Sequence, residues 1–271
     1  MKTGKTTLHL LVWLLLLAGS GGCTRSILQV RPVSGEVAWI DGRPTTRTEQ
    51  DSLGLVASFE RLDMQYLALD IEIKNRSGHA IEVNPTDFRY VALNADRDTV
   101  YRVLSAGSSY PLVYSAADPA LEGDRVVTNQ EREVKRLKRA KVINTVLMVA
   151  VIASDVASTA SSRNRSPERW VQNRVTHDNL YTAIQAKRLI DHGTFADRMQ
   201  RYDYESYRWK ELALKRTTVE AGQSVRGLVY LPYNREISYL LVGYTRPELQ
   251  PVTVTFRQEW VKERSRKTAS N

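Results

Sequence analysis

Few side chains in this sequence have the types and spacing that catalysis or metal binding requires. His79, His177 and His192 lie far apart, and none has a His, Cys or Glu neighbour at a zinc-ligand spacing. Asp70 and Glu72 are two residues apart, which on a strand places both carboxylates on one face. They could act as an acid–base pair or bind a hard cation such as calcium, but solvated carboxylates are the commoner outcome. We therefore predict no catalytic residue, no metal site, no cofactor and no enzymatic activity.

The N-terminus has the order of a secretory signal, in which basic residues precede an apolar run and then small residues. The apolar run 8–18 follows two lysines and is interrupted only by His9. It has about half the roughly 20 residues that a membrane-spanning helix needs, so we do not expect a permanent anchor helix here. Cys23 is the only cysteine of the chain and has no partner for an internal disulfide.

The residues before Cys23 resemble the lipobox of bacterial lipoproteins, where a peptidase cuts before a cysteine that receives a diacylglyceryl group. Gly21 and Gly22 match the small residues of that motif, whereas Ser20 stands where an aliphatic residue is usual. The resemblance implies a signal peptide 1–22, lipidation at Cys23, and an exported protein lipid-anchored to the inner or outer membrane of the bacterial cell envelope. A signal cut elsewhere would leave Cys23 as a free thiol.

The net charge of +9 is concentrated in two segments. Residues 131–141 hold six basic residues against two acidic ones, and residues 257–267 hold five against two. Such segments attract anionic lipid headgroups or acidic surface polymers, or form solvated helix faces. Nucleic acid is not an expected partner, because an exported chain rarely meets it and no aromatic-interleaved binding motif is present.

Alternation of apolar and polar residues predicts strands on both sides of a helical segment. The clearest example is 66–74, where aliphatic residues alternate with small or charged ones. Asp41 and Gly42 follow a candidate strand and form a strong hairpin-turn signal. Seven or more short strands, split by helices, predict a mainly β chain in which a β-sandwich carries a helical-hairpin insertion.

The boundaries of that insertion come from local helix signals. Thr128 and Glu131 form a capping-box sequence at its start, and Gly193 is typical of a helix end. The predicted parts are a signal peptide 1–22, an N-terminal part of the β-sandwich 23–127, a helical insertion 128–193, a C-terminal part of the β-sandwich 194–260 and a disordered tail 261–271.

Small residues within the helical segment 142–162 form a possible helix-association face. They recur at steps of three and four, which places on one side Ala150, Ala153, Ser154, Ala157 and Ser158. Three interpretations are open: antiparallel packing on the helix 167–192, self-association into a homo-oligomer, and membrane contact. The apolar stretch of about a dozen residues, together with Asp155, disfavours deep membrane insertion.

Four aromatic residues follow the helical segment: Tyr202, Tyr204, Tyr207 and Trp209. They predict either an exposed strip for carbohydrate or protein contact or the packing of the insertion on the sandwich.

Two passages resemble bacterial envelope lipoproteins with immunoglobulin-like sandwiches. Residues 69–75 (LDIEIKN) and 83–88 (VNPTDF) are similar to the telokin-like domain family, where a strand ends at Asn and a later Pro-x-x-Phe starts the next. Residues 214–231 resemble the turn and strand pairing of envelope lipoproteins. The resemblance implies an immunoglobulin-like fold with no shared catalytic site.

The sequence thus predicts a non-enzymatic cell-envelope lipoprotein, a binding or structural module for an envelope protein or a surface polymer. The alternative is a membrane-active or oligomer-forming component that uses helix 142–162.

Overall fold

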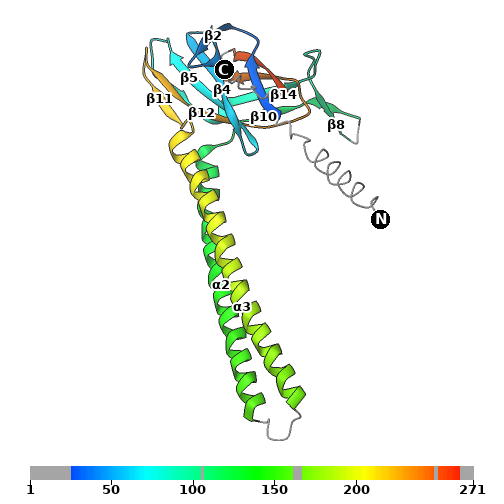
Figure 1. The fold of residues 1–271 in the computed structure, drawn as a ribbon. Helices are drawn as coiled ribbons and strands as arrows, with labels where there is room; N and C mark the ends of the chain where they lie inside the picture. Colours follow the sequence, from blue (N-terminus) through cyan, green and yellow to red (C-terminus); the bar gives the residue numbers. More distant parts are fainter. Residues whose placement is uncertain (1–25, 105–106, 161–166, 247–249, 263–271) are drawn as a thin grey trace, which may run out of the picture.

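The computed structural model describes residues 26–104, 107–160, 167–246 and 250–262. Two antiparallel five-stranded sheets form a body, and two long helices project from it side by side as a hairpin (Figure 1). The predicted signal peptide 1–22, Cys23 and residues 263–271 of the predicted tail lie outside the described residues. The packed sheets and the helical insertion agree with the sequence prediction, but helices of 42 and 41 residues make the chain mixed α and β.

Every neighbouring pair of named strands in the described body is antiparallel. The first sheet has the order β1 (Ser26–Pro32), β14 (Val252–Lys262), β13 (Tyr239–Tyr244), β7 (Phe88–Leu93), β10 (Val113–Ser115). The second has the order β12 (Ser224–Pro232), β5 (Tyr66–Asn75), β4 (Leu53–Asp63), β3 (Arg43–Gln50), β2 (Glu36–Ile40). Smaller elements are the ladders β6 (Ile81–Val83) with β11 (Thr217–Val219) and β8 (Tyr101–Val103) with β9 (Ser109–Pro111), and the 3-10 turn η1 (Pro85–Asp87).

The predicted alternation in 66–74 positions β5 at the centre of the body. Its aliphatic side chains, Leu67, Leu69, Ile71 and Ile73, are buried in one cluster with residues of the first sheet such as Phe88 and Phe256. The two sheets therefore share a single core. The predicted turn is also confirmed, because Asp41 and Gly42 join β2 to β3 with positive φ angles of 50° and 74°.

The opposite face of β5 is buried as well, but by a different part of the chain. Tyr66 and Ala68 pack there in a second cluster with Tyr230 of β12 and Trp209. Trp209 belongs to the π-helical turn η3 (Arg208–Leu212) that follows the second helix. The base of the helical hairpin thus covers part of the outer face of the second sheet.

The helical hairpin is longer at both ends than the sequence signals predict. α2 (Pro119–Ala160) begins where Asp118 Oδ1 accepts a hydrogen bond from the backbone N–H of Ala120 at 2.9 Å. Thr128 therefore lies inside the helix, and the predicted capping box does not start it. α3 (Pro167–Tyr207) continues through Gly193, which the sequence predicts as its end. Each helix is about 60 Å long at 1.5 Å per residue.

We expect Gly193→Ala to raise the free energy of unfolding by about 0.5–1 kcal/mol, because glycine in a helix interior loses more backbone entropy than alanine. Space is available, since no described atom beyond the neighbouring helix backbone lies within 4 Å of the added Cβ. Gly227→Ala is the matched control. Its Cβ would lie 2.8 Å from Leu214 Cα, so it should lower stability. Chemical denaturation of both variants checks the opposite signs.

Candidate functional site

A buried charged and aromatic cluster, here called the arm root, joins the helical hairpin, here called the arm, to the second sheet. The arm root comprises Asp63, Tyr66, Arg208, Trp209 and Tyr230. Arg208 Nη1 donates to Asp63 Oδ1 at 3.1 Å, and both side chains are buried. The guanidinium carbon of Arg208 lies over the ring centroids of Tyr66, Trp209 and Tyr230 at 5.6, 4.5 and 5.5 Å. The ion pair and the cation–π contacts together compensate the burial of Arg208.

The π-helical turn places Arg208 and Trp209 in the arm root. The backbone N–H of Ala213 donates to Arg208 O at 3.0 Å, five residues back, which closes the wide turn. The Trp209 ring meets the rings of Tyr66 and Tyr230 edge-on, at centroid distances of 5.6 and 4.9 Å. Burial raises the pKa of Tyr230 to about 12, so its hydroxyl stays protonated at neutral pH. The arm is thus fixed to the body by packing that excludes water.

The aromatic residues that the sequence groups at this junction divide between packing and exposure. Trp209 is buried, and the Tyr204 hydroxyl donates to Asp63 Oδ2 at 2.9 Å. Tyr207 remains exposed. Tyr202 is partly buried and packs against the cluster of Trp209, so the predicted packing of the insertion on the body is confirmed for Trp209 and Tyr202. Tyr204 is 40% exposed and reaches the body through its hydroxyl.

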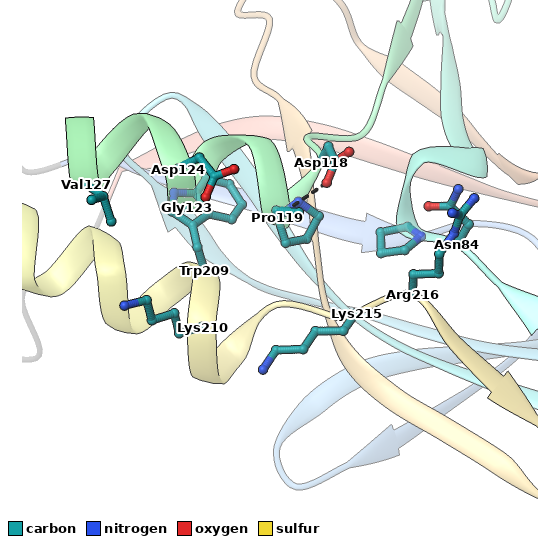
Figure 2. A pocket seen from close by; sticks show the side chains of 12 residues that line it. Asn84, Asp118, Pro119, Gly123, Asp124, Val127, Trp209, Lys210, Lys215 and Arg216 are labelled. Carbon is teal, nitrogen blue, oxygen red and sulfur yellow. Dashed lines mark hydrogen bonds between the residues drawn. The ribbon is translucent and has the colours of Figure 1, made fainter. Parts of the chain in front are cut away.

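A cavity of about 570 Å³ opens beside the arm root (Figure 2). Figure 2 shows the start of α2 on one side, with Asp118 and Asp124, and Lys210, Lys215 and Arg216 on the other. Several of these charges already have partners: Asp118 caps α2, and Arg216 pairs with Glu82 at 2.9 Å. The described residues that line the cavity include no Ser, Thr, Cys, His or Tyr. The cavity therefore offers charges of both signs and an apolar wall.

Polar side chains occupy the seam between α2 and α3. The interhelical pairs include Arg198 Nη1 to Glu133 Oε2 at 3.0 Å, Asn144 Nδ2 to Asp191 Oδ2 at 3.0 Å, Arg174 Nη1 to Asp155 Oδ2 at 3.3 Å, and Ser154 Oγ to His177 Nδ1 at 3.4 Å. Asn144 is buried, and buried polar pairs of this kind fix the register of helices. Hydrogen bonds from Lys187 and Asn144 hold the pKa of the Asp191 carboxyl below its usual value.

Apolar side chains cover the outer surface of the distal half of α2. The most exposed, each between 52% and 64% exposed, are Val142, Ile143, Val146, Val149, Ile152 and Val156. α2 is apolar and long enough to cross a membrane by length and composition alone. Only 6% of an apolar 18-residue stretch of this helix is buried. Exposed helix faces are normally polar, so an apolar surface of this breadth is unusual for a helix in water. We call residues 142–157 of α2 and 171–186 of α3 the distal arm.

The predicted helix-association face lies on this outer surface. Ala150, Ala153 and Ala157 are exposed, Ser154 reaches His177 at the edge of the seam, and the side chain of Ser158 lies outside the described residues. The predicted antiparallel packing on α3 occurs, but it uses the face of Asn144 and Asp155. Of the apolar residues of α3, Ile184 is buried in the hairpin, whereas Leu180 and Ile190 are exposed.

Asp70 and Glu72 lie on one face of β5, as their spacing predicts, and line one pocket. Asp70 accepts two hydrogen bonds from Arg226, at 2.9 and 2.6 Å, which explains the raised pKa of that guanidinium. Glu72 lies on the same outer face of β5, beside the Asp70–Arg226 pair. Within the described ranges, no group of three or more His, Cys, Asp or Glu side chains could hold a metal ion.

Comparisons with protein-family models, with curated proteins and with solved structures find no match to this chain. The arm root has no local sequence signal, because Asp63 and Arg208 are 145 positions apart. The apolar run 142–157 is visible in the sequence, but the sequence does not show that this run is exposed.

Proposed function

We propose that this protein is a non-enzymatic cell-envelope lipoprotein that binds its partner through the distal arm. In this proposal Cys23 carries the lipid anchor, and the body is an immunoglobulin-like sandwich that supports the arm. The observation that carries the proposal is the exposed apolar surface of α2, from Val142 to Val156. A water-exposed surface of this breadth is stable in an exported protein when another molecule covers it.

The arm root supports a binding role for the arm. A loosely attached hairpin would lose orientational entropy on binding, whereas one fixed by Arg208 and Trp209 presents its far end in a defined direction. At about 60 Å, the arm also places its binding surface well away from the body.

Shortening the arm tests this function. Residues 142–190 are replaced by a short Gly-Ser linker, because the register set by Asn144 and Asp191 brings residues 141 and 191 close together. Both the intact and the shortened chain carry Cys23→Ser, so that a lipid anchor does not hide the contribution of the arm. We expect the body of the shortened protein to unfold at the same denaturant concentration as that of the intact chain. Its affinity for isolated envelope fractions should fall at least about tenfold. Equal binding by both chains would contradict the proposal.

The edge strand β2 carries the second candidate surface. Val37, Trp39 and Ile40 are exposed there, and Trp39 is 70% exposed. An exposed edge with an aromatic side chain can take an added strand or a sugar ring, which suits the envelope protein or surface polymer predicted from the sequence. Full envelope binding by the shortened chain, lost on Trp39→Ala, would assign the function to this surface instead.

A further inference from the structure

We infer that the distal arm binds the surface of an anionic phospholipid bilayer. In this arrangement the outer face of α2 lies in the boundary between headgroups and acyl chains, and α3 stays on the aqueous side. The inference rests on the proposed function and names its partner. It depends on the breadth of the apolar surface and on the cations beside it.

The apolar surface of distal α2 is broader than a helical partner needs. A coiled-coil seam is a narrow stripe, whereas here the ridge of Val142, Val146 and Val149 is flanked on both sides by exposed aliphatic residues, Leu147 on one and Ile152 on the other. A second helix on the ridge would leave flanking side chains in water. A bilayer surface covers the ridge and both flanks together.

A ring of cations, here called the collar, adjoins this surface on the side of the body. It consists of Arg132, Lys135, Arg136, Lys138, Arg139 and Lys141 of α2 with Lys187 and Arg188 of α3. All eight are exposed, and no ion pair within the described residues involves Arg132, Lys138, Arg139 or Lys141. Basic residues beside an apolar membrane-contacting helix attract anionic headgroups.

The pairing of the helices places two cations of α3 beside those of α2. Sequence order alone does not reveal this part of the collar. Asn144 bonds Asp191, which brings Lys187 and Arg188 to the level of the last basic residues of α2. A groove of about 300 Å³ opens between the helices at this level, with Lys141 and Arg188 among its lining residues. Asp191 also lines it, but its carboxylate accepts a hydrogen bond from Lys187 at 2.6 Å. Cations of both helices therefore face one opening of a size that suits a phosphate headgroup.

Beyond the collar, the charges of the distal arm are few and lie away from the apolar face of α2. Asp155 pairs with Arg174 in the seam at 3.3 Å, and Asp178 is exposed on α3. α2 is long and apolar enough to cross a membrane by length and composition alone, but it is paired along the seam with α3. α3 exposes Val171 and Val175 but also Asp178 and other polar residues, so the paired helices favour a position in the interface over a membrane-spanning one.

Vesicle flotation tests the inference directly. The protein is the chain from Thr24 to Asn271, which contains every described residue and no cysteine. The vesicles are phosphatidylcholine alone, or phosphatidylcholine mixed with phosphatidylglycerol. We expect flotation with the mixed vesicles, much weaker flotation with phosphatidylcholine alone, and release by salt.

Two double variants separate the apolar face from the charge. Val146→Asp with Val149→Asp should weaken binding to the mixed vesicles at least about 100-fold, because two exposed apolar contacts become charged. Thr182→Asp with Ala186→Asp adds the same charge at the same level of α3, on the aqueous side, and should bind more tightly than the valine pair by at least about tenfold. Both pairs replace exposed residues, and circular dichroism checks that the helices remain.

A collar variant tests the headgroup contact. Lys138→Gln with Arg139→Gln should weaken binding about 25-fold, since each cation near an anionic surface contributes roughly fivefold.

Three results would overturn the inference. The first is failure of the intact chain to float with the mixed vesicles; arm-dependent binding to envelope fractions would then identify a protein partner and leave the proposed function standing. The second is equal flotation with both vesicle types. The third is a lipid-free dimer, seen by analytical ultracentrifugation and abolished by the valine pair, which would assign the surface to a second copy of the chain.

Discussion

Replacing Asp63 by alanine is expected to lower the free energy of unfolding by about 3–5 kcal/mol, because it leaves the guanidinium of Arg208 buried without a counter-ion. Asp63 also accepts hydrogen bonds from Tyr204 and Arg61, so its removal leaves further donors unpaired. The aromatic rings around Arg208 exclude the water that would otherwise solvate the charge. Urea denaturation of the variant measures the loss.

An exposed ion pair is the control for Asp63. Glu82 and Arg216 pair at 2.9 Å with both side chains largely exposed, so Glu82→Ala should cost less than about 1 kcal/mol. Asp63→Asn, which retains hydrogen-bond acceptance without the charge, should fall between the two. A cost for Asp63→Ala no larger than that of Glu82→Ala would show that the arm root does not depend on this pair.

Trp209→Ala is expected to cost about 3–5 kcal/mol and to loosen the arm while the sheets remain folded. Trp209 is buried in the cluster with Tyr66 and Tyr230, which is separate from the core shared by the sheets. Limited proteolysis should therefore cut the variant faster between η3 and β11, where the arm rejoins the body. Circular dichroism should retain the strand signal.

Phe256→Ala provides the matched comparison for Trp209. Phe256 is fully buried in the shared core, so its loss should destabilise the sheets by a similar amount without selective cleavage after η3. Identical cleavage patterns for the two variants would mean that the arm root and the core unfold as one unit.

The strands were predictable because their signals are local. The alternation in β5 and the turn at Asp41 and Gly42 each depend on neighbouring residues, and the structure places both as expected. The limits of the helices were not predictable, because a Thr-x-x-Glu sequence caps a helix only where the preceding residues leave the helical conformation. Residues before Thr128 continue the helix back to Asp118, and Gly193 is tolerated within exposed α3.

The candidate site was predictable in part, for a different reason. An apolar helical run has the same pattern whether it is buried in a core, packed on a partner or placed in lipid, so the sequence located 142–157 without its environment. Its exposure depends on which face α3 covers, and polar residues such as Asn144 and Asp191 determine that face. The arm root required the fold, because Asp63 reaches Arg208 only after the second sheet and the hairpin are in place.

The most direct test of the central claim, that the outer face of α2 is covered in the envelope, is thiol accessibility. The chain from Thr24 lacks cysteine, so Val146→Cys on α2 and Thr182→Cys on α3 each introduce one thiol into the distal arm. In the free protein both thiols should react with a water-soluble maleimide, because both positions are exposed. After binding to envelope fractions, we predict protection at position 146 and continued reaction at position 182. Equal reactivity of the two thiols in the bound protein would contradict the account.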